Sequence, residues 1–386
     1  MIFDCIILGA GASGLMCAAK IKNAKTLIIE GNQKPGLKLL ASGGGLCNFY
    51  NADLSFKNYY GQNPHFCISA LKSFDFEDFK KLLAENKADF TLREDGKFFA
   101  RSSRSVLDAL LNSLGQNIDI RLGCKFKKAL KNGDIFEVYA GGEVFKCKNL
   151  VCSLGALSHK NMGASSAAFD LAESFGHEIV PPYPALCGVV FTGDLKKRFA
   201  DTAGISLKAE LTCGKNKFLG GLLFTHDGIS GPALFNLSLY GIKNKTLEIN
   251  FCPQIKAEDF IKQNKNGPKH LLSLIERLIP PRLAKAILNG FDKKTADLTK
   301  EEISQTAKQI NDFSFTVEKL TGYEKAEITA GGISTKEISS KTMMSQKTKS
   351  LYFTGECLDI SGQLGGYNLA WAWASACAAA KAINEN

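Results

Sequence analysis

The first 30 residues constrain the fold more than any other part of the chain. An apolar, β-branched run at residues 3–8 leads directly into the glycine pattern GAGASG at residues 9–14. A helical stretch follows at 15–22, and a second apolar run at 26–29 ends at Glu30. This order of strand, GxGxxG turn, helix, strand and carboxylate is typical of a Rossmann-type dinucleotide-binding unit.

Each glycine of this turn has a separate expected role. Gly9 permits the tight turn from strand to helix, Gly11 lets a pyrophosphate approach the backbone, and Gly14 lets helix and strand pack closely. The diphosphate is expected at the helix N-terminus, where free N–H groups and the helix dipole favour an anion. Glu30 lies 19 residues after Gly11, where a carboxylate can accept hydrogen bonds from ribose hydroxyls. The expected cofactor contacts in this unit are Gly9, Gly11, Ala12, Ser13, Gly14, Glu30 and Gly31.

Length and composition indicate a globular protein of more than one unit. The 386 residues are many for a single core, and 45% hydrophobic and 22% charged residues are ordinary values. No run approaches the roughly 18 apolar residues of a membrane helix, and the apolar opening lacks the basic start of a signal peptide. We therefore expect a cytoplasmic protein that does not contact membranes.

The cysteines and the charge exclude little but favour some partners over others. Twelve cysteines are scattered singly, without CxxC or paired Cys/His spacing, which predicts reduced thiols and no metal site. The net charge of +10 indicates either attraction to nucleic acid or lysines spread over solvated faces. Because the lysines are dispersed, composition favours a small-molecule substrate, and nucleic acid is disfavoured without being excluded.

The C-terminus contains a second strand–loop–helix pattern. A strand at 351–354 ends at Gly355 and Glu356, and the sequence GGYNL at 365–369 opens an alanine-rich helix at 370–383. Two such patterns more than 300 residues apart suit FAD stretched between the two chain ends, although a packing helix after a glycine loop is the alternative. Glu356 would meet the ribityl chain or pyrophosphate, and the glycine pair would approach the flavin pyrimidine edge. The expected contacts are Gly355, Glu356, Gly365, Gly366, Tyr367, Asn368 and Leu369.

Three stretches spread over nearly the whole chain resemble one known family. They are PGLKLLASGGGLCN at 35–48, FTHDGISGP at 224–232, and GECLD at 355–359 with GGYNLAWAW at 365–373. The sequence resembles the HI0933-like (YhiN/BaiN-type, aminoacetone-oxidase-like) family of FAD-dependent oxidoreductases. The resemblance implies an α/β fold, in which a Rossmann-like FAD-binding domain carries an inserted β-rich, barrel-like domain and a small helical subdomain.

The resemblance also assigns residues and domain limits. The FAD-binding domain would cover 1–185 and 328–386, the β-rich domain 186–256 and 311–327, and the helical subdomain 257–310. Leu46 stands where the family usually has arginine, so any contact made by that arginine is absent here. Residues expected along the isoalloxazine and its linker are Lys38, Ser42, Gly43, Gly44, Cys47 and Asn48, with Phe126 at the adenine through its backbone. Apart from the resemblance, Gly155 follows a strand at 150–153 and would lie near the phosphates, with an ordinary strand-to-turn glycine as the alternative.

Two residues are candidates for catalysis. His226 would be a proton donor or orienter beside the flavin, or a histidine that fixes the 225–232 loop by hydrogen bonds. Cys47 would be a thiol near the flavin, and a buried structural thiol is the favoured alternative unless its pKa is lowered.

We expect hydride transfer between flavin N5 and a small organic substrate, such as an enone. NAD(P)H is the expected donor at the same flavin face, because the sequence has no second GxGxxG fingerprint. An RNA-modifying flavoenzyme, an amine oxidase and a flavin-holding interaction protein are the alternatives. The sequence does not define the substrate or the oligomeric state.

Overall fold

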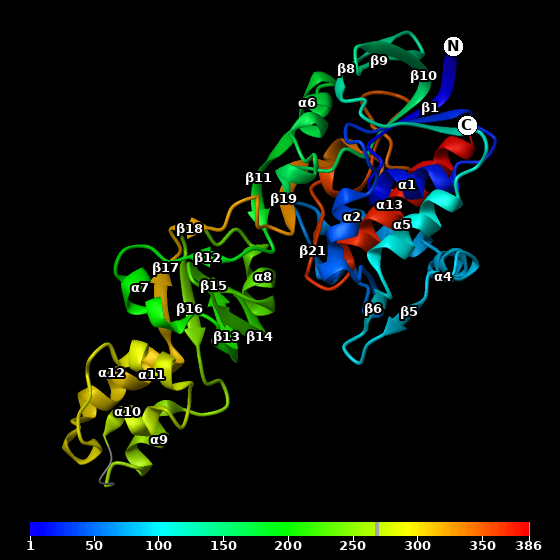
Figure 1. Cartoon of the computed structure of the whole chain (residues 1–386). Helices are drawn as coiled ribbons and strands as arrows, with labels where there is room; N and C mark the ends of the chain where they lie inside the picture. Colours follow the sequence, from blue (N-terminus) through cyan, green and yellow to red (C-terminus); the bar gives the residue numbers. More distant parts are fainter. Residues whose placement is uncertain (267–269, 386) are drawn as a thin grey trace. The chain divides into compact units, whose positions relative to one another are not determined.

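A computed structural model describes residues 1–266 and 270–385. The chain forms two compact units (Figure 1), one made of residues 1–184 and 327–385 and the other of residues 185–326. Each unit has its own hydrophobic core. Among the described residues, none of the helices combines the length and apolarity needed to cross a membrane.

A mainly parallel sheet forms the centre of the first unit. Its parallel strands, in spatial order, are β7 (Ile118–Arg121), β2 (Thr26–Ile29), β1 (Ile2–Leu8), β10 (Glu143–Cys152) and β20 (Leu351–Phe353). The antiparallel strands β9 (Ile135–Ala140) and β8 (Phe126–Asn132) extend from β10. In the register of this sheet, Leu8 lies between Ile29 and Cys152, and Cys152 pairs with Phe353. The strand ends that carry the expected cofactor residues are therefore aligned.

Helices cover this sheet because their apolar faces need a partner. α1 (Ala12–Lys20) packs along α13 (Tyr367–Asn384), and Figure 1 shows these two chain ends side by side. In α13, Trp371 and Trp373 are buried and donate their indole N–H groups to the carbonyls of Gly355 and Phe49, at 3.1 and 3.0 Å. The other helices are α2 (Leu37–Ala41), α3 (Ile68–Ser73), α4 (Phe76–Glu85), α5 (Ser103–Asn112) and α6 (Ala167–Ser174).

Small sheets support the loops around this core. They pair β3 (Asn48–Asn51) and β5 (Phe90–Leu92) with β6 (Lys97–Ala100), β4 (Tyr59–Tyr60) with β21 (Ser361–Gly362), and β11 (Ile179–Ala185) with β19 (Ile328–Ile333). The sheets β4–β21 and β11–β19 each join segments on either side of the inserted residues. The pairing of β4 with β21 brings residues 59–60 close to the C-terminal motif.

The second unit is an antiparallel sheet with helices beside it and a helical cluster at one end (Figure 1). Its strands, in spatial order, are β17 (Phe313–Thr316), β16 (Thr246–Asn250), β13 (Ser206–Cys213), β14 (Asn216–Phe224), β15 (Gly228–Ser230), β12 (Val189–Val190) and β18 (Lys319–Leu320). β17 and β18 lie at opposite ends of this order, yet two residues connect them. Three Cα–Cα steps from Thr316 to Lys319 span at most about 11 Å, so the sheet must curl toward itself. The predicted fold class, with its Rossmann-like domain and inserted barrel-like β domain, is confirmed.

The helices of the second unit begin where local chemistry favours it. They are α7 (Gly193–Arg198), α8 (Pro232–Ser238), α9 (Ala257–Gln263), α10 (Leu271–Ile275), α11 (Pro281–Leu288) and α12 (Lys300–Asn311). α12 has a capping box, with Glu302 N–H donating to Thr299 Oγ1 and Thr299 N–H donating to Glu302 Oε2. Pro281 starts α11, because a proline fits the first helical turn, where its missing N–H is not needed.

Candidate active site

The two glycine motifs meet at the carboxyl ends of the parallel strands. Thr354 Oγ1, directly after β20, accepts a hydrogen bond from Ser13 Oγ at 2.8 Å and lies 2.7 Å from Ser153 Oγ after β10. A Cβ on Gly355 would stand 3.0 Å from the Ser13 Cβ. In open α/β sheets this edge is where ligands bind. The structure thus brings residues from both chain ends to one place.

In the GxGxxG turn, Gly9 and Gly14 are tightly packed against the backbone, whereas Gly11 faces free space. A Cβ on Gly9 (φ 98°) would stand 2.5 Å from the Ser153 carbonyl oxygen, and a Cβ on Gly14 would stand 1.9 Å from the Gly9 oxygen. At Gly11, the N-cap of α1, an added Cβ would meet no atom within 4 Å. The same holds at Gly155. The residues present therefore fit a diphosphate group, because space is left where the helix N-terminus offers N–H groups.

Glu30 is held at the end of β2 by backbone and side-chain donors. The Ala10 N–H donates to Glu30 Oε2 at 2.8 Å, and the backbone and side-chain amides of Asn32 donate to Oε1 at 2.8 Å each. The Cys124 N–H donates to the Glu30 carbonyl at 2.8 Å, which places the start of β8, with buried Phe126, beside this strand end. A Cβ added to Gly31 would stand 3.7 Å from the Lys125 Cα. The predicted ribose and adenine residues therefore lie together.

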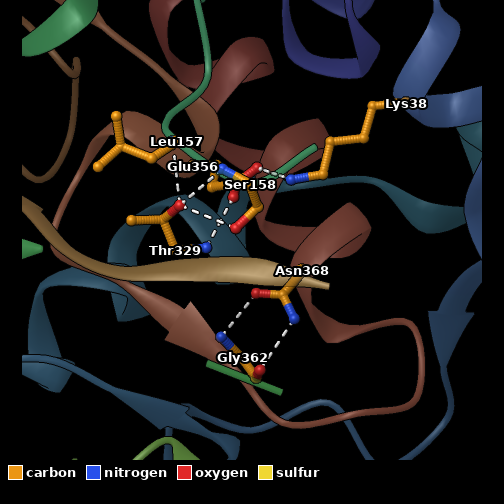
Figure 2. A network of polar contacts seen from close by, with 7 residues as sticks. All are labelled: Lys38, Leu157, Ser158, Thr329, Glu356, Gly362 and Asn368. Carbon is orange, nitrogen blue, oxygen red and sulfur yellow. Dashed lines mark hydrogen bonds and ion pairs between the residues drawn. The ribbon is translucent and has the colours of Figure 1, made fainter. Parts of the chain in front are cut away.

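An ion pair links the stretch 35–48 to the C-terminal motif at 355–359. Lys38 Nζ lies 2.6 Å from Glu356 Oε2, and the Thr329 N–H donates to Glu356 Oε1 at 2.9 Å (Figure 2). Thr329 Oγ1 accepts from the N–H groups of Leu157 and Ser158, both at 3.0 Å. Segments far apart in the sequence thus converge on one carboxylate. The network adds Leu157, Ser158 and Thr329 to the residues that the sequence predicted.

The glycine loop before α13 is clamped by side chains. Asn368 exchanges two hydrogen bonds of 2.8 Å with the backbone of Gly362 (Figure 2), and Asn51 Nδ2 donates to the Gly365 carbonyl at 2.9 Å. Tyr59 donates its hydroxyl to the Tyr367 carbonyl at 2.8 Å. A Cβ on Gly366 (φ 93°) would stand 2.6 Å from the Tyr50 oxygen. The N-terminus of α13, with Leu369 in its first turn, is therefore held in a defined position.

The loop at residues 42–48 combines left-handed backbone with space above it. Gly43 and Gly44 have φ of 57° and 65°, and a Cβ on Gly44 would meet nothing within 4 Å. Cys47 is fully buried, and burial raises the pKa of its thiol to about 12. A thiol with this pKa stays protonated at neutral pH, which favours the structural interpretation of Cys47. Ser42 accepts the Cys47 N–H through its carbonyl at 3.0 Å, Asn48 Oδ1 adjoins Gly366, and Leu46 is exposed.

His226 lies in the second unit, in the turn between β14 and β15, and its side chain is exposed. The turn is closed by Thr225, whose Oγ1 accepts from the Gly228 N–H at 3.2 Å and whose N–H donates to the Gly228 carbonyl at 2.8 Å. Thr225 thus closes this loop by hydrogen bonds, which is the structural role that one interpretation gave to His226. The role of His226 at the flavin stays a prediction.

The sequence analysis assigned no role to two further groups. His159, next to Ser158, has a left-handed backbone (φ 68°), and burial together with the Lys38 charge lowers its pKa. Asp359 is buried and accepts the Gln62 N–H at 2.8 Å, and burial raises its pKa to about 6. A histidine or a carboxylate in a loop gives no local signal of such an environment, which depends on distant contacts.

Together, the fold and the site define a flavoprotein of the Rossmann-type, FAD-dependent oxidoreductase class. The family model described as "HI0933-like protein Rossmann domain" matches residues 3–382. The chain belongs to this HI0933-like family of FAD-dependent oxidoreductases.

Similar proteins span the whole chain. The ribosomal RNA dihydrouridine synthases of Haemophilus influenzae and Escherichia coli are 37% and 33% identical, each over 98% of this chain and 98% and 97% of the relative. A 3-dehydro-bile acid delta(4,6)-reductase of Clostridium scindens is 29% identical over 98% of both chains. The Mycobacterium smegmatis Sdh1 complex in the apo form shares the fold at a TM-score of 0.51 and 13% identity, over 99% of this chain and 68% of that one.

Proposed function

We propose that this flavoenzyme reduces a carbon–carbon double bond conjugated to a carbonyl, and that its substrate is a uridine of ribosomal RNA. The observation that carries the proposal is the 37% identity to the Haemophilus influenzae ribosomal RNA dihydrouridine synthase over 98% of both chains. The inserted residues 185–326 also contain 21 Lys and Arg against 15 Asp and Glu, so more than half of the net charge of +10 lies there. That charge supports a polyanionic substrate.

The reactions for which the two kinds of relative are named share one chemistry. In uracil, the C5=C6 bond is conjugated to the C4 carbonyl, and a 3-oxo steroid with a delta(4,6) diene has the same arrangement. When bound, FAD supplies the two electrons as a hydride, which NAD(P)H replenishes. The hydride adds to C6 of uracil, the π electrons move toward C5 and O4, and a proton adds to C5. The net change is NAD(P)H plus one proton and uridine going to NAD(P)⁺ and dihydrouridine.

The residues of this chain would prepare that step by binding and orienting. Gly11 and the start of α1 would hold the diphosphate, and Glu30 the adenine ribose. Glu356, fixed by Lys38 and Thr329, would hold the ribityl region. The N-terminus of α13 would stabilise negative charge at the flavin pyrimidine edge.

A small conjugated ketone is the second candidate substrate, supported by the 29% identical bile acid reductase. Both candidates use the same hydride chemistry, so the protein surface around the flavin decides between them. We place NAD(P)H at the same flavin face as the substrate, in a ping-pong cycle, because the sequence has one GxGxxG fingerprint. Initial-rate kinetics that require a ternary complex would contradict this cycle.

The test is the dihydrouridine content of ribosomal RNA from a strain in which the gene is deleted. We expect mass spectrometry of the digested RNA to show a lost dihydrouridine, restored by the wild-type gene and not by the Gly11→Val variant. Unchanged dihydrouridine in the deletion strain would refute the RNA substrate. Reduction of a 3-oxo-Δ4 steroid by the purified protein would then support the second candidate.

A further inference from the structure

A cationic hollow lies on the first unit, outside the residues assigned to FAD. It has a volume of about 470 Å³ and is lined by residues from 63–66 and from 335–346. Among its described lining residues, His65, Lys336 and Lys341 are basic and none is Asp or Glu. The hollow therefore presents positive charge without an acidic group in its wall.

The walls of the hollow are attached to the C-terminal FAD motif. The Gln62 N–H, next to lining residue Asn63, donates to Asp359 Oδ2 at 2.8 Å. The ring of lining residue Phe66 packs edge-on against Trp371, with centroids 6.2 Å apart, and Trp371 is the donor to the Gly355 carbonyl. A ligand in the hollow would thus contact elements fixed to the cofactor site.

The lysines of the hollow have charge available for a ligand. Lys336 Nζ lies 3.7 Å from Glu178, but both side chains are about two-thirds exposed, and such pairs contribute little. Lys341 has no carboxylate within 4.0 Å among the residues that the structure describes. Glu337, on the same segment, is paired with Lys347 at 2.8 Å. The acidic group between the two lysines is therefore already neutralised.

We infer that this hollow binds the sugar–phosphate backbone of the RNA substrate close to the nucleotide that is reduced, an inference that rests on the proposed function. Phosphate oxygens are contacted in proteins mainly by lysine and arginine, by hydroxyl groups and by side-chain amides. The hollow supplies this set from Asn63, Thr335, Lys336, Ser339, Ser340 and Lys341. Two lysine ammonium groups in one hollow, together with hydroxyl and amide groups, match the repeated negative charges of a phosphodiester chain.

The test is RNA binding by the FAD-loaded Lys336→Glu/Lys341→Glu protein, measured over a range of salt concentrations. The probe is ribosomal RNA from the deletion strain. We expect the Kd to rise about tenfold or more and the slope of log K against log salt to fall by about two. The matched control is Lys72→Glu/Lys127→Glu, with the same charge change at exposed lysines outside the hollow. It should bind RNA more tightly than the hollow variant, and bleaching of the flavin by NAD(P)H should be unchanged in both.

The outcomes separate this inference from the proposed function. If the hollow and control variants bind RNA equally, the hollow is not a backbone site, although the wild type still forms dihydrouridine. If the hollow variant loses FAD content or flavin bleaching, its defect lies in the cofactor site and the inference is also overturned. The milder Lys336→Gln/Lys341→Gln variant should show an intermediate loss of RNA affinity. A wild type that neither binds ribosomal RNA nor modifies it refutes the proposed function itself.

Discussion

Gly11→Val should separate folding of the first unit from binding of FAD. Gly11 has φ −83° and ψ −171°, an extended conformation that valine adopts readily, and an added Cβ would meet no protein atom within 4 Å. The unfolding free energy of the FAD-free protein should therefore change by no more than about 0.5 kcal/mol. The valine methyls would occupy the space predicted for the diphosphate, so the variant should not bind FAD.

The assay is thermal denaturation of the FAD-free proteins during titration with FAD. At FAD concentrations of about 1,000 times Kd, the wild type should gain about 4 kcal/mol, or roughly 10 °C in Tm, and Gly11→Val should gain nothing. Gly14→Ala is the contrasting control, because its Cβ would stand 1.9 Å from the Gly9 oxygen and should destabilise even the FAD-free protein by about 2 kcal/mol. Stabilisation of Gly11→Val by FAD, or unfolding of that variant without FAD, would refute the reasoning.

Three further predictions concern other parts of the chain. Burial raises the pKa of Asp359 from 3.8 to about 6, so the folded state binds the proton more tightly than the unfolded state. About 3 kcal/mol of stability that is present below pH 4 should therefore be lost as the pH rises through 6. In urea unfolding Asp359→Asn should lack this loss, and a pH profile equal to that of the wild type would contradict the prediction. Cys47→Ser should keep kcat within about threefold, since a thiol with a pKa of about 12 is no proton shuttle at neutral pH, and a hundredfold loss with FAD still bound would show otherwise. Thr299→Ala should lower the free energy of unfolding by about 1 kcal/mol through loss of the capping box with Glu302, whereas Thr299→Ser should not.

Local patterns were sufficient for the elements whose signals are local. The strand before Gly9 and the strand before Glu30 are buried on both faces, so they appear as continuous apolar runs. The start of α12 has a local signal too, because a capping box such as Thr299 with Glu302 needs only two residues three positions apart. A local pattern does not decide the place of Pro281, since a proline that ends one helix also suits the first turn of the next.

The assembled site could be predicted only in part. Family resemblance indicated Lys38, and the C-terminal strand–loop–helix pattern indicated Glu356. Their ion pair joins residues 318 positions apart, which no local pattern encodes. Thr329 belongs to no sequence motif. Its hydroxyl accepts hydrogen bonds from residues 157 and 158 because the fold brings β19 beside them. The left-handed backbone at His159 and the buried environment of Asp359 likewise arise from tertiary packing.

The central claim is that bound FAD passes a hydride to a uridine of ribosomal RNA. The most direct test is anaerobic: the purified protein is bleached with NADPH or NADH, the excess donor is removed, and ribosomal RNA from the deletion strain is added. We predict that the oxidised flavin spectrum returns and that one dihydrouridine forms for each flavin reoxidised. A flavin that stays reduced with the RNA but is reoxidised by a small conjugated ketone would contradict the RNA substrate, and a protein that binds no FAD would contradict the whole account.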